Sequence, residues 1–258
     1  MCLIFLARDL HPRYSLVIVS NRDEYHVRPT AEAHRWKDFP SILGGRDLSK
    51  GGTWLGIDSK GRWAAVTNFR EAPRSINNGS LSRGYLTRDF LRSALTAKEY
   101  SSHLTKKNLP HDGFNLLVGD TEGVFYVSNR STRKKTSYTP LPKVGLFGLS
   151  NHLLDTNWPK VRIGKERLLN IFQYDEIDPE QIFELLQDRT PAKTSELPDT
   201  GISKSWEETL SSTFIISPEY GTRSSTVILI HKRSGKMEFN EISYSPSGEV
   251  DGRATLTI

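Results

Sequence analysis

Short apolar runs separated by turn signals predict that much of the chain is β-sheet. Residues 3–6 and 16–19 are rich in branched apolar side chains and flank a Pro-containing turn, so they predict a buried β-hairpin near the start of the chain. Residues 53–57 and 62–67 flank a turn that ends in Gly61, a residue that readily adopts positive φ. A second hairpin is therefore predicted there.

Longer stretches with apolar residues three and four positions apart predict helices. Residues 82–106 show this spacing and predict two consecutive helical pieces, with Ser82 as the N-cap. Residues 158–172 and 179–186 predict two more helices, which we expect to pack outside the sheet. By contrast, residues 28–50 combine several Pro and Gly residues with no clear periodicity, and we expect a long surface loop there.

Further strands are predicted in the middle and in the C-terminal third of the chain. They cover residues 114–118, 124–127, 145–149, 213–216, 225–231 and 237–244. Hairpins are more frequent than strand–helix–strand units, which favours antiparallel sheets with helices on their faces over a doubly wound parallel sheet. Because no linker or internal repeat is visible, we expect an α+β fold in a single domain over residues 1–258.

Composition excludes several classes of protein. The chain has 258 residues, of which 36% are hydrophobic and 25% charged, so a disordered or fibrous protein is excluded. The longest apolar runs are far shorter than the ~20 residues of a membrane-spanning helix, and Arg8 and Asp9 interrupt the first run, so neither a membrane segment nor a secretory signal is expected. A single cysteine excludes an intramolecular disulfide and favours the cytoplasm.

Charge and motifs give no sign of nucleic acid, metal or nucleotide binding. The net charge is +5, and the basic residues are scattered rather than clustered, so no nucleic-acid partner is expected. The seven histidines lack metal-binding spacing, and neither GxGxxG nor GxxxxGK[ST] occurs. No metal or cofactor is therefore predicted from these motifs.

Cys2 is the residue most suggestive of chemistry. Methionine aminopeptidase removes Met1 when the next side chain is small, and cysteine qualifies. Cys2 then carries a thiol and a free α-amine of pKa about 7.7–8.0, so one residue holds a nucleophile and a base that can accept its proton. Taken alone, a cysteine at this position is more often a small apolar residue that opens a strand.

Polar residues next to the predicted strands supply the context for Cys2. Arg22 and Asp23 end the strand that pairs with the one opened by Cys2, where a carboxylate can hold the ammonium and an arginine can stabilise a thiolate. The alternative is a solvated turn that terminates the strand.

Two asparagines and a second arginine stand beside other predicted strands. Asn68 and Asn151 each follow a strand, and an amide held there can donate to an oxyanion, a contribution of roughly 3–4 kcal/mol. Asparagine is also common in ordinary turns after strands. Arg223 opens a later strand and can bring a cation to the same sheet edge, although an ordinary turn is equally consistent.

Several motifs together resemble the NRDE family, also called the transport and Golgi organisation protein 2 family. They are Met1-Cys2-Leu3-Ile4-Phe5, Ser20-Asn21-Arg22-Asp23-Glu24-Tyr25, Arg28-Pro29-Thr30, Gly51-Gly52-Thr53-Trp54-Leu55-Gly56 and Thr67-Asn68-Phe69-Arg70. The resemblance continues more loosely through Gly148-Leu149-Ser150-Asn151 and Gly221-Thr222-Arg223-Ser224-Ser225-Thr226. It implies links to the secretory pathway, mitochondria, lipid homeostasis and haem movement, which are described for eukaryotic members.

The start of the chain is also similar to the cysteine-type N-terminal nucleophile (Ntn) hydrolases, such as bile salt hydrolase and penicillin V acylase. This resemblance implies a four-layered αββα sandwich of antiparallel sheets. It matches Cys2 to the nucleophile, Asp23 to the acid that orients its amine, Asn68 to the oxyanion-hole residue and Asn151 to a later active-site asparagine.

The arginines fit that pattern less well. The hydrolases carry an arginine just before the asparagine of this turn, where the chain has Ser20, whereas Arg22 comes one position after Asn21. Arg22 and Arg223 are therefore the weaker matches among the predicted site residues.

Two functions follow from these resemblances. The first is an N-terminal-cysteine amidohydrolase, in which Cys2 forms an acyl-enzyme from a non-peptide amide or a thioester. The alternative is a non-catalytic binding or trafficking protein for haem or an acyl-CoA-type lipid, in which Cys2 and a histidine can ligate haem iron.

Overall fold

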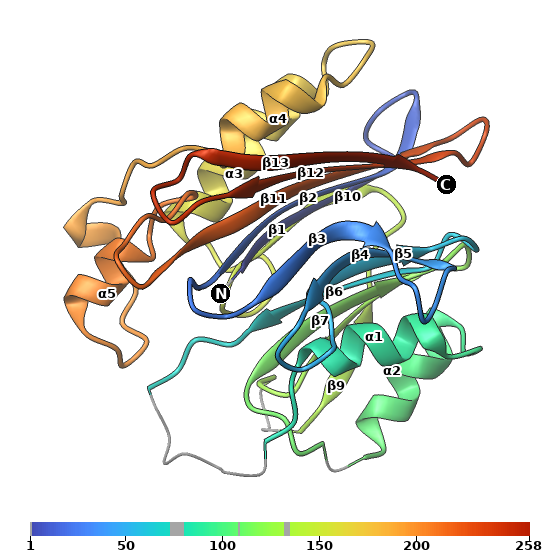
Figure 1. Ribbon diagram of the computed structural model, residues 1–258, viewed down its shortest axis with the longest axis horizontal. Helices are drawn as coiled ribbons and strands as arrows, with labels where there is room; N and C mark the ends of the chain where they lie inside the picture. Colours follow the sequence, from blue (N-terminus) through green and yellow to red (C-terminus); the bar gives the residue numbers. More distant parts are fainter. Residues whose placement is uncertain (1, 73–79, 108, 132–134) are drawn as a thin grey trace. The chain divides into compact units, whose positions relative to one another are not determined.

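The chain forms two compact units and passes between them more than once. The computed structural model describes residues 2–72, 80–107, 109–131 and 135–258 (Figure 1). The first unit comprises Met1–Val27, Lys143–Ser150 and Leu154–Ile258, and the second comprises Arg28–Pro142 and Asn151–Leu153. A single domain over residues 1–258 stays a prediction.

The first unit contains a six-stranded antiparallel sheet in the order β10-β1-β2-β11-β12-β13. Its strands are β1 (Cys2–Arg8), β2 (Tyr14–Tyr25), β10 (Gly145–Leu149), β11 (Tyr220–His231), β12 (Met237–Tyr244) and β13 (Val250–Thr257). The two long central strands, β2 and β11, each have twelve residues. The sheet therefore brings the start of the chain next to its C-terminal third.

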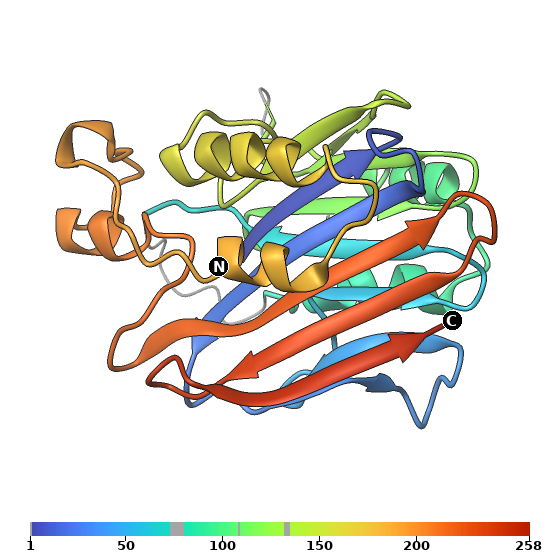
Figure 2. The ribbon, with the colours of Figure 1, turned by 90° about the horizontal axis from the view of Figure 1, so that it is seen from above.

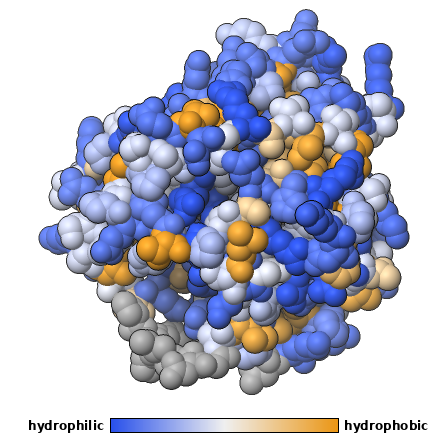
Figure 3. Space-filling view, viewed as in Figure 1, coloured by the Kyte–Doolittle hydropathy of each residue, from blue (hydrophilic) through white to orange (hydrophobic). Residues whose placement is uncertain are grey.

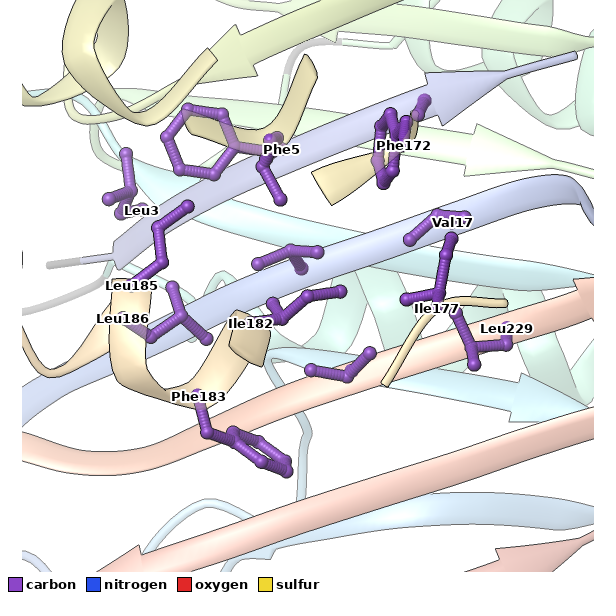
Figure 4. Packing of buried hydrophobic residues seen from close by; sticks show 14 of the residues in the cluster. Leu3, Phe5, Val17, Phe172, Ile177, Ile182, Phe183, Leu185, Leu186 and Leu229 are labelled. Carbon is purple, nitrogen blue, oxygen red and sulfur yellow. The ribbon is translucent and has the colours of Figure 1, made fainter. Parts of the chain in front are cut away.

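Helices α3 (Pro159–Ile171) and α4 (Pro179–Leu186) cover one face of this sheet (Figure 2). Alternate side chains of the strands point to this face and pack with α4, as Figure 4 shows for Leu3, Val17 and Ile182. The first unit also contains a short 3-10 helix, η1 (Thr194–Glu196), and α5 (Lys204–Thr209). Apolar residues recur at every second position in the strands and about every 3.6 positions in the helices. Each element therefore has one apolar face, and these faces pack together as one layer between sheet and helices.

The second unit contains a seven-stranded antiparallel sheet in the order β3-β4-β5-β6-β7-β8-β9. Its strands are β3 (Thr30–Arg35), β4 (Ile42–Asp47), β5 (Leu55–Asp58), β6 (Trp63–Asn68), β7 (Phe114–Gly119), β8 (Val124–Ser128) and β9 (Ser137–Pro140). Helices α1 (Gly84–Arg92) and α2 (Ala97–Thr105) pack on this sheet through a second apolar core. Each unit thus has one sheet layer and one helix layer.

The predicted hairpins and helices are confirmed. β1 pairs with β2, β5 pairs with β6, and Gly61 in the second turn has φ +80°. The predicted helices correspond to α1 to α4, and both sheets are antiparallel. The α+β fold class is therefore confirmed.

The surface loop predicted for residues 28–50 is wrong, because this segment contains β3 and β4. Gly44 and Gly45 obscured the second of these strands, since glycine weakens a strand pattern. Both glycines are required by close packing: a Cβ on Gly44 would lie 2.6 Å from the Leu55 carbonyl oxygen, and one on Gly45 would lie 2.3 Å from the Trp54 ring.

Smaller corrections concern the ends of other elements. The N-cap of α1 is Arg83 rather than Ser82, and its side chain makes no capping hydrogen bond. The strand predicted for residues 213–216 is absent except for an isolated bridge between Ile216 and Gly221. β9, α5 and β13 are not predicted from the sequence, because their patterns are short or mostly polar.

None of the helices in the described ranges has the length and apolar character to span a membrane. On the face shown in Figure 3, apolar side chains occur singly or in small groups among polar ones.

Candidate active site

The pairing of three strands places Cys2, Arg22 and Ser224 in one row across the first unit's sheet. Cys2 lies opposite Arg22, and Arg22 lies opposite Ser224. Directly opposed residues of antiparallel strands point to the same face. All three are buried, with exposures of 8%, 4% and 5%, and the Ser224 hydroxyl has no hydrogen-bond partner within the part of the chain that the structure describes.

The Cys2 thiol is held in its protonated form. Burial is the main cause that raises its pKa, and the Asp23 carboxylate raises it further. The positive charge of the N-terminus, the charge of Arg22 and a hydrogen bond from the Asp23 backbone N–H lower the pKa but do not reverse the shift. Cys2 is therefore not a ready thiolate at neutral pH, and a base must remove its proton before it can act as a nucleophile.

The Asp23 carboxylate is oriented by Thr222. The Thr222 hydroxyl donates to Oδ1 of Asp23 at 2.7 Å and accepts from the backbone N–H of Ile215 at 2.9 Å. Because the Ile215 N–H can only donate and an ionised carboxylate can only accept, the hydroxyl hydrogen is directed to Asp23. Tyr220 adds a hydrogen bond from its hydroxyl to the Asp23 backbone carbonyl oxygen at 2.9 Å.

Sequence reasoning missed Thr222 as a site residue. It stands directly before Arg223 in the motif that carries the resemblance, which was the available signal. Its role depends on the pairing of β11 with β2, in which Thr222 lies opposite Asp23. No local pattern reveals a partner that is 199 positions away in the chain.

Arg223 lies in an irregularity of β11. The register with β2 shifts between Thr222 and Ser224, so Arg223 is the extra residue of a β-bulge. Its guanidinium Nη1 donates to the backbone carbonyl oxygens of Tyr25 at 3.3 Å and His26 at 3.0 Å. The bulge thereby directs this arginine to the end of β2, where Asp23 also lies.

Asn21 has a structural role beside the site. Its side-chain amide donates to the carbonyl oxygens of Leu186 at 2.8 Å and Thr213 at 2.9 Å. Its own oxygen accepts from the Ser225 hydroxyl at 2.6 Å. Asn21 thus connects β2 to the end of α4, to the segment before β11 and to β11 itself.

Asn68 and Asn151 belong to the second unit, where the structure brings them together. The Asn151 side-chain amide donates to the Asn68 backbone carbonyl oxygen at 2.9 Å, and the backbone N–H of Arg70 donates to the Asn151 carbonyl oxygen at 2.6 Å. The residue before Asn151 is Ser150 of the first unit, whose hydroxyl donates to the Cys2 carbonyl oxygen at 3.4 Å. Their roles toward Cys2 stay predictions.

The residues next to these asparagines form a compact cluster in the second unit. The rings of Phe69 and His152 are in contact, with centroids 4.9 Å apart. Burial lowers the pKa of His152, and the neighbouring charge of Arg70 lowers it further. His152 is therefore neutral at pH 7.

The described residues contain no group of three or more His, Cys, Asp or Glu side chains arranged to hold a metal ion. The functional groups near Cys2 are its own thiol, one carboxylate, guanidinium groups and hydroxyls. This set suits acid–base and nucleophilic chemistry.

Comparison with known proteins identifies the family. The family model described as Transport and Golgi organisation 2 matches residues 1–246. The chain belongs to this family. It is 32% identical to the Transport and Golgi organization protein 2 homolog of Bos taurus over 263 residues, covering 94% of this chain and 93% of that protein. It is 29% identical to the Transport and Golgi organization protein 2 of Drosophila melanogaster, covering 96% and 95%.

Two amide hydrolases are among the solved structures with a similar fold. A C2A mutant of conjugated bile acid hydrolase from Clostridium perfringens has a TM-score of 0.54 and 12% identity, covering 100% of this chain and 92% of that one. An N-acylethanolamine-hydrolyzing acid amidase ortholog from Caenorhabditis elegans has a TM-score of 0.53 and 12% identity, covering 91% and 95%. At such identity the likeness shows the fold alone, and it confirms the predicted resemblance to Ntn hydrolases.

Proposed function

We propose that this member of the Transport and Golgi organisation 2 family hydrolyses a non-peptide amide or a thioester, with Cys2 as nucleophile after removal of Met1. The observation that carries the proposal is the position of Cys2 beside Arg22 and Asp23, with the Asp23 carboxylate fixed by the Thr222 hydroxyl. The fold shared with amide hydrolases supports it as an analogy.

In the acylation step, the α-amine of Cys2 accepts the thiol proton and the sulfur attacks the substrate carbonyl carbon. The tetrahedral intermediate then breaks its C–N bond, or its C–S bond in a thioester. The leaving group takes the proton from the α-ammonium. The product of this step is a thioester between the acyl group and Cys2.

In the deacylation step, the free α-amine removes a proton from water, and the resulting hydroxide attacks the thioester carbon. The C–S bond breaks, the Cys2 sulfur regains its proton from the α-ammonium, and the carboxylic acid leaves. The Asp23 carboxylate holds the α-amine in position during both steps. This role requires a carboxylate of fixed orientation, which the Thr222 hydrogen bond supplies.

Burial, which raises the pKa of the Cys2 thiol in the chain that carries Met1, is the reason that a base is required. A thiol that burial keeps protonated needs a base, and an α-amine of pKa about 7.7–8.0 is suited to proton transfer near neutral pH. The roles of Asn68 and Asn151 as oxyanion donors, and of Arg22 and Arg223 as cations of the site, rest on the resemblance to Ntn hydrolases.

The experiment that tests the proposal is a hydrolysis screen with N-acyl amides and acyl thioesters, using protein whose intact mass shows loss of Met1. We expect turnover that is abolished in Cys2→Ala and strongly reduced in Asp23→Asn. Asp9→Asn, at an exposed position directly after the far end of β1, is the matched control and should leave the rate unchanged. Activity that survives in Cys2→Ala, or no turnover of any member of the panel, would refute the proposal.

The alternative role, as a carrier of haem or an acyl-CoA-type lipid, stays a prediction, as does a cytoplasmic location. A carrier would bind haem, or an acyl-CoA thioester from the same screen, and release it unchanged. Mass analysis of the recovered ligand separates this outcome from hydrolysis.

A further inference from the structure

A groove of about 300 Å³ opens in the first unit between α5 and the segment that leads into β11. Its lining residues are Ser205, Trp206, Thr209, Ser217, Pro218 and Glu219. The volume is at the lower end of the range for small-molecule sites, about 300–1,000 Å³. The groove therefore suits a compact chemical group.

The indole of Trp206 forms the aromatic wall of this groove. Trp206 is 37% exposed, whereas the other four tryptophans of the chain are at most 9% exposed. Its ring meets the Tyr220 ring edge-on, with centroids 5.9 Å apart. The Tyr220 hydroxyl donates to the Asp23 backbone carbonyl oxygen, so one ring separates the groove wall from Asp23.

The charge of the groove is negative. Glu219 is the one charged side chain among the lining residues, it is exposed, and no ion pair joins it to any other part of the chain that the structure describes. Nearby cations lie outside the lining: Lys204 precedes Ser205 on α5, and Arg223 is engaged by the carbonyl oxygens of Tyr25 and His26.

We propose that this groove binds an organic ammonium group with apolar substituents. An indole attracts a cation through its negative ring face, and Trp is the best residue for this contact. The Glu219 carboxylate complements the same charge and would repel an anion. A purely apolar ligand would use the indole but would leave the carboxylate without a partner.

Resting on the proposed function, we extend this inference to the substrate of Cys2, which would carry such an ammonium group. The groove residue Glu219 directly precedes Tyr220, which lies opposite Tyr25 on β2. Arg22, opposite Cys2, is three residues before Tyr25, a separation of about 10 Å along the strand. Side chains three positions apart on a strand point to opposite faces of the sheet, so the substrate would reach Cys2 by extending around the end of β2 and β11.

Choline and its uncharged carbon analogue 3,3-dimethylbutan-1-ol test the binding site without catalysis. Binding is followed by NMR through the indole N–H signal of Trp206, which Trp206→Phe identifies by its loss. We expect saturable binding of choline in the millimolar range, with the neutral analogue weaker by about threefold or more. Glu219→Gln should weaken choline binding by about threefold. Glu208→Gln, on α5 but outside the lining, is the matched control and should have no effect.

Three results would overturn the groove proposal: no shift of the Trp206 signal with choline, equal binding of the charged and neutral compounds, or equal weakening by Glu219→Gln and Glu208→Gln. A second arm compares the hydrolysis of matched amides with and without a trimethylammonium group. Hydrolysis that shows no preference for the charged amide overturns the substrate inference and leaves the hydrolase intact. Choline binding without any hydrolysis refutes the proposed hydrolase function but supports the groove as an ammonium-binding site.

Discussion

At the scale of single residues, the state of Cys2 is set by burial and by the charges of Asp23 and Arg22. Cys2 is the one cysteine of the chain, so alkylation with iodoacetamide reports on this thiol alone. The raised pKa predicts slow alkylation at pH 7 that accelerates as the pH rises through the thiol pKa.

Asp23→Asn tests the electrostatic part of this description. The Asp23 carboxylate raises the Cys2 pKa, so its neutralisation lowers that pKa and increases the thiolate fraction below it. In protein that retains Met1, we expect alkylation of Asp23→Asn at pH 8 to be several-fold faster than that of the wild type. Asp9→Asn should match the wild type, and an unchanged pH profile in Asp23→Asn would contradict the assignment.

Thr222 is predicted to stabilise the fold as well as to orient Asp23. Thr222→Val keeps the branched shape but removes the hydrogen bonds that the hydroxyl makes with the Ile215 N–H and with the Asp23 carboxylate. We expect it to lower the free energy of unfolding by about 1–3 kcal/mol in urea titrations, and Thr222→Ser to recover most of that loss. Thr139→Val, on the exposed strand β9, should be neutral, and a neutral Thr222→Val would show that these hydrogen bonds contribute little.

The sequence was sufficient to predict that Cys2 lies beside Arg22 and Asp23, because the two strands that carry these residues form one hairpin. It could not predict the contributions of Thr222, Tyr220 or Ile215, which depend on β11, about 200 positions later in the chain. The β-bulge at Arg223 could not be predicted from the sequence either, since a register shift depends on both paired strands.

At the scale of elements, Asn21 is the link between the site strands and their helical cover. Its amide binds the Leu186 and Thr213 carbonyl oxygens, and its oxygen accepts from Ser225. Asn21→Ala would leave these buried groups unsatisfied, and we expect the free energy of unfolding to fall by roughly 2–4 kcal/mol. The exposed Asn170→Ala is the control and should change it little. A similar small change in both variants would contradict this role.

Hairpins and helices with strong periodicity were predictable from local sequence, whereas strands with glycine or polar alternation were not. β4 contains Gly44 and Gly45 at points where a Cβ would collide with β5 or with Trp54, so packing rather than strand propensity selects these residues. β13 alternates between exposed and half-exposed positions at the edge of its sheet, and its sequence therefore lacks an apolar pattern.

At the scale of the whole molecule, histidine burial predicts a dependence of stability on pH. Burial is the main cause that lowers the pKa of His111 and His152, and Arg83 and Arg70 respectively lower it further. A base with a depressed pKa in the folded state contributes stability above its unfolded pKa of about 6.5. That stability is lost as the pH falls through the folded-state pKa.

We therefore expect the free energy of unfolding to be lower at pH 5 than at pH 7.5. The double variant His111→Gln/His152→Gln should show a smaller fall over the same interval. His103→Gln, at an exposed position of α2, serves as the control. An identical fall in the double variant and the wild type would assign the dependence to other groups.

Membership of the Transport and Golgi organisation 2 family and the fold of amide hydrolases were both accessible from the N-terminal motifs. The fold does not establish the reaction that the protein catalyses, because a likeness at 12% identity shows the fold alone. In the proposed mechanism the free α-amine of Cys2 is the base for its own thiol, and this amine exists only after removal of Met1.

The most direct measurement compares two forms of the protein on the same amide panel. One form begins at Cys2, and the other carries one glycine before Cys2, so that both have the thiol but only the first has its free α-amine. We predict turnover, and an acyl adduct on Cys2 detectable by intact mass, in the first form only. Equal turnover in both forms, or an adduct on neither, would contradict the claim that Cys2 acts as an N-terminal nucleophile.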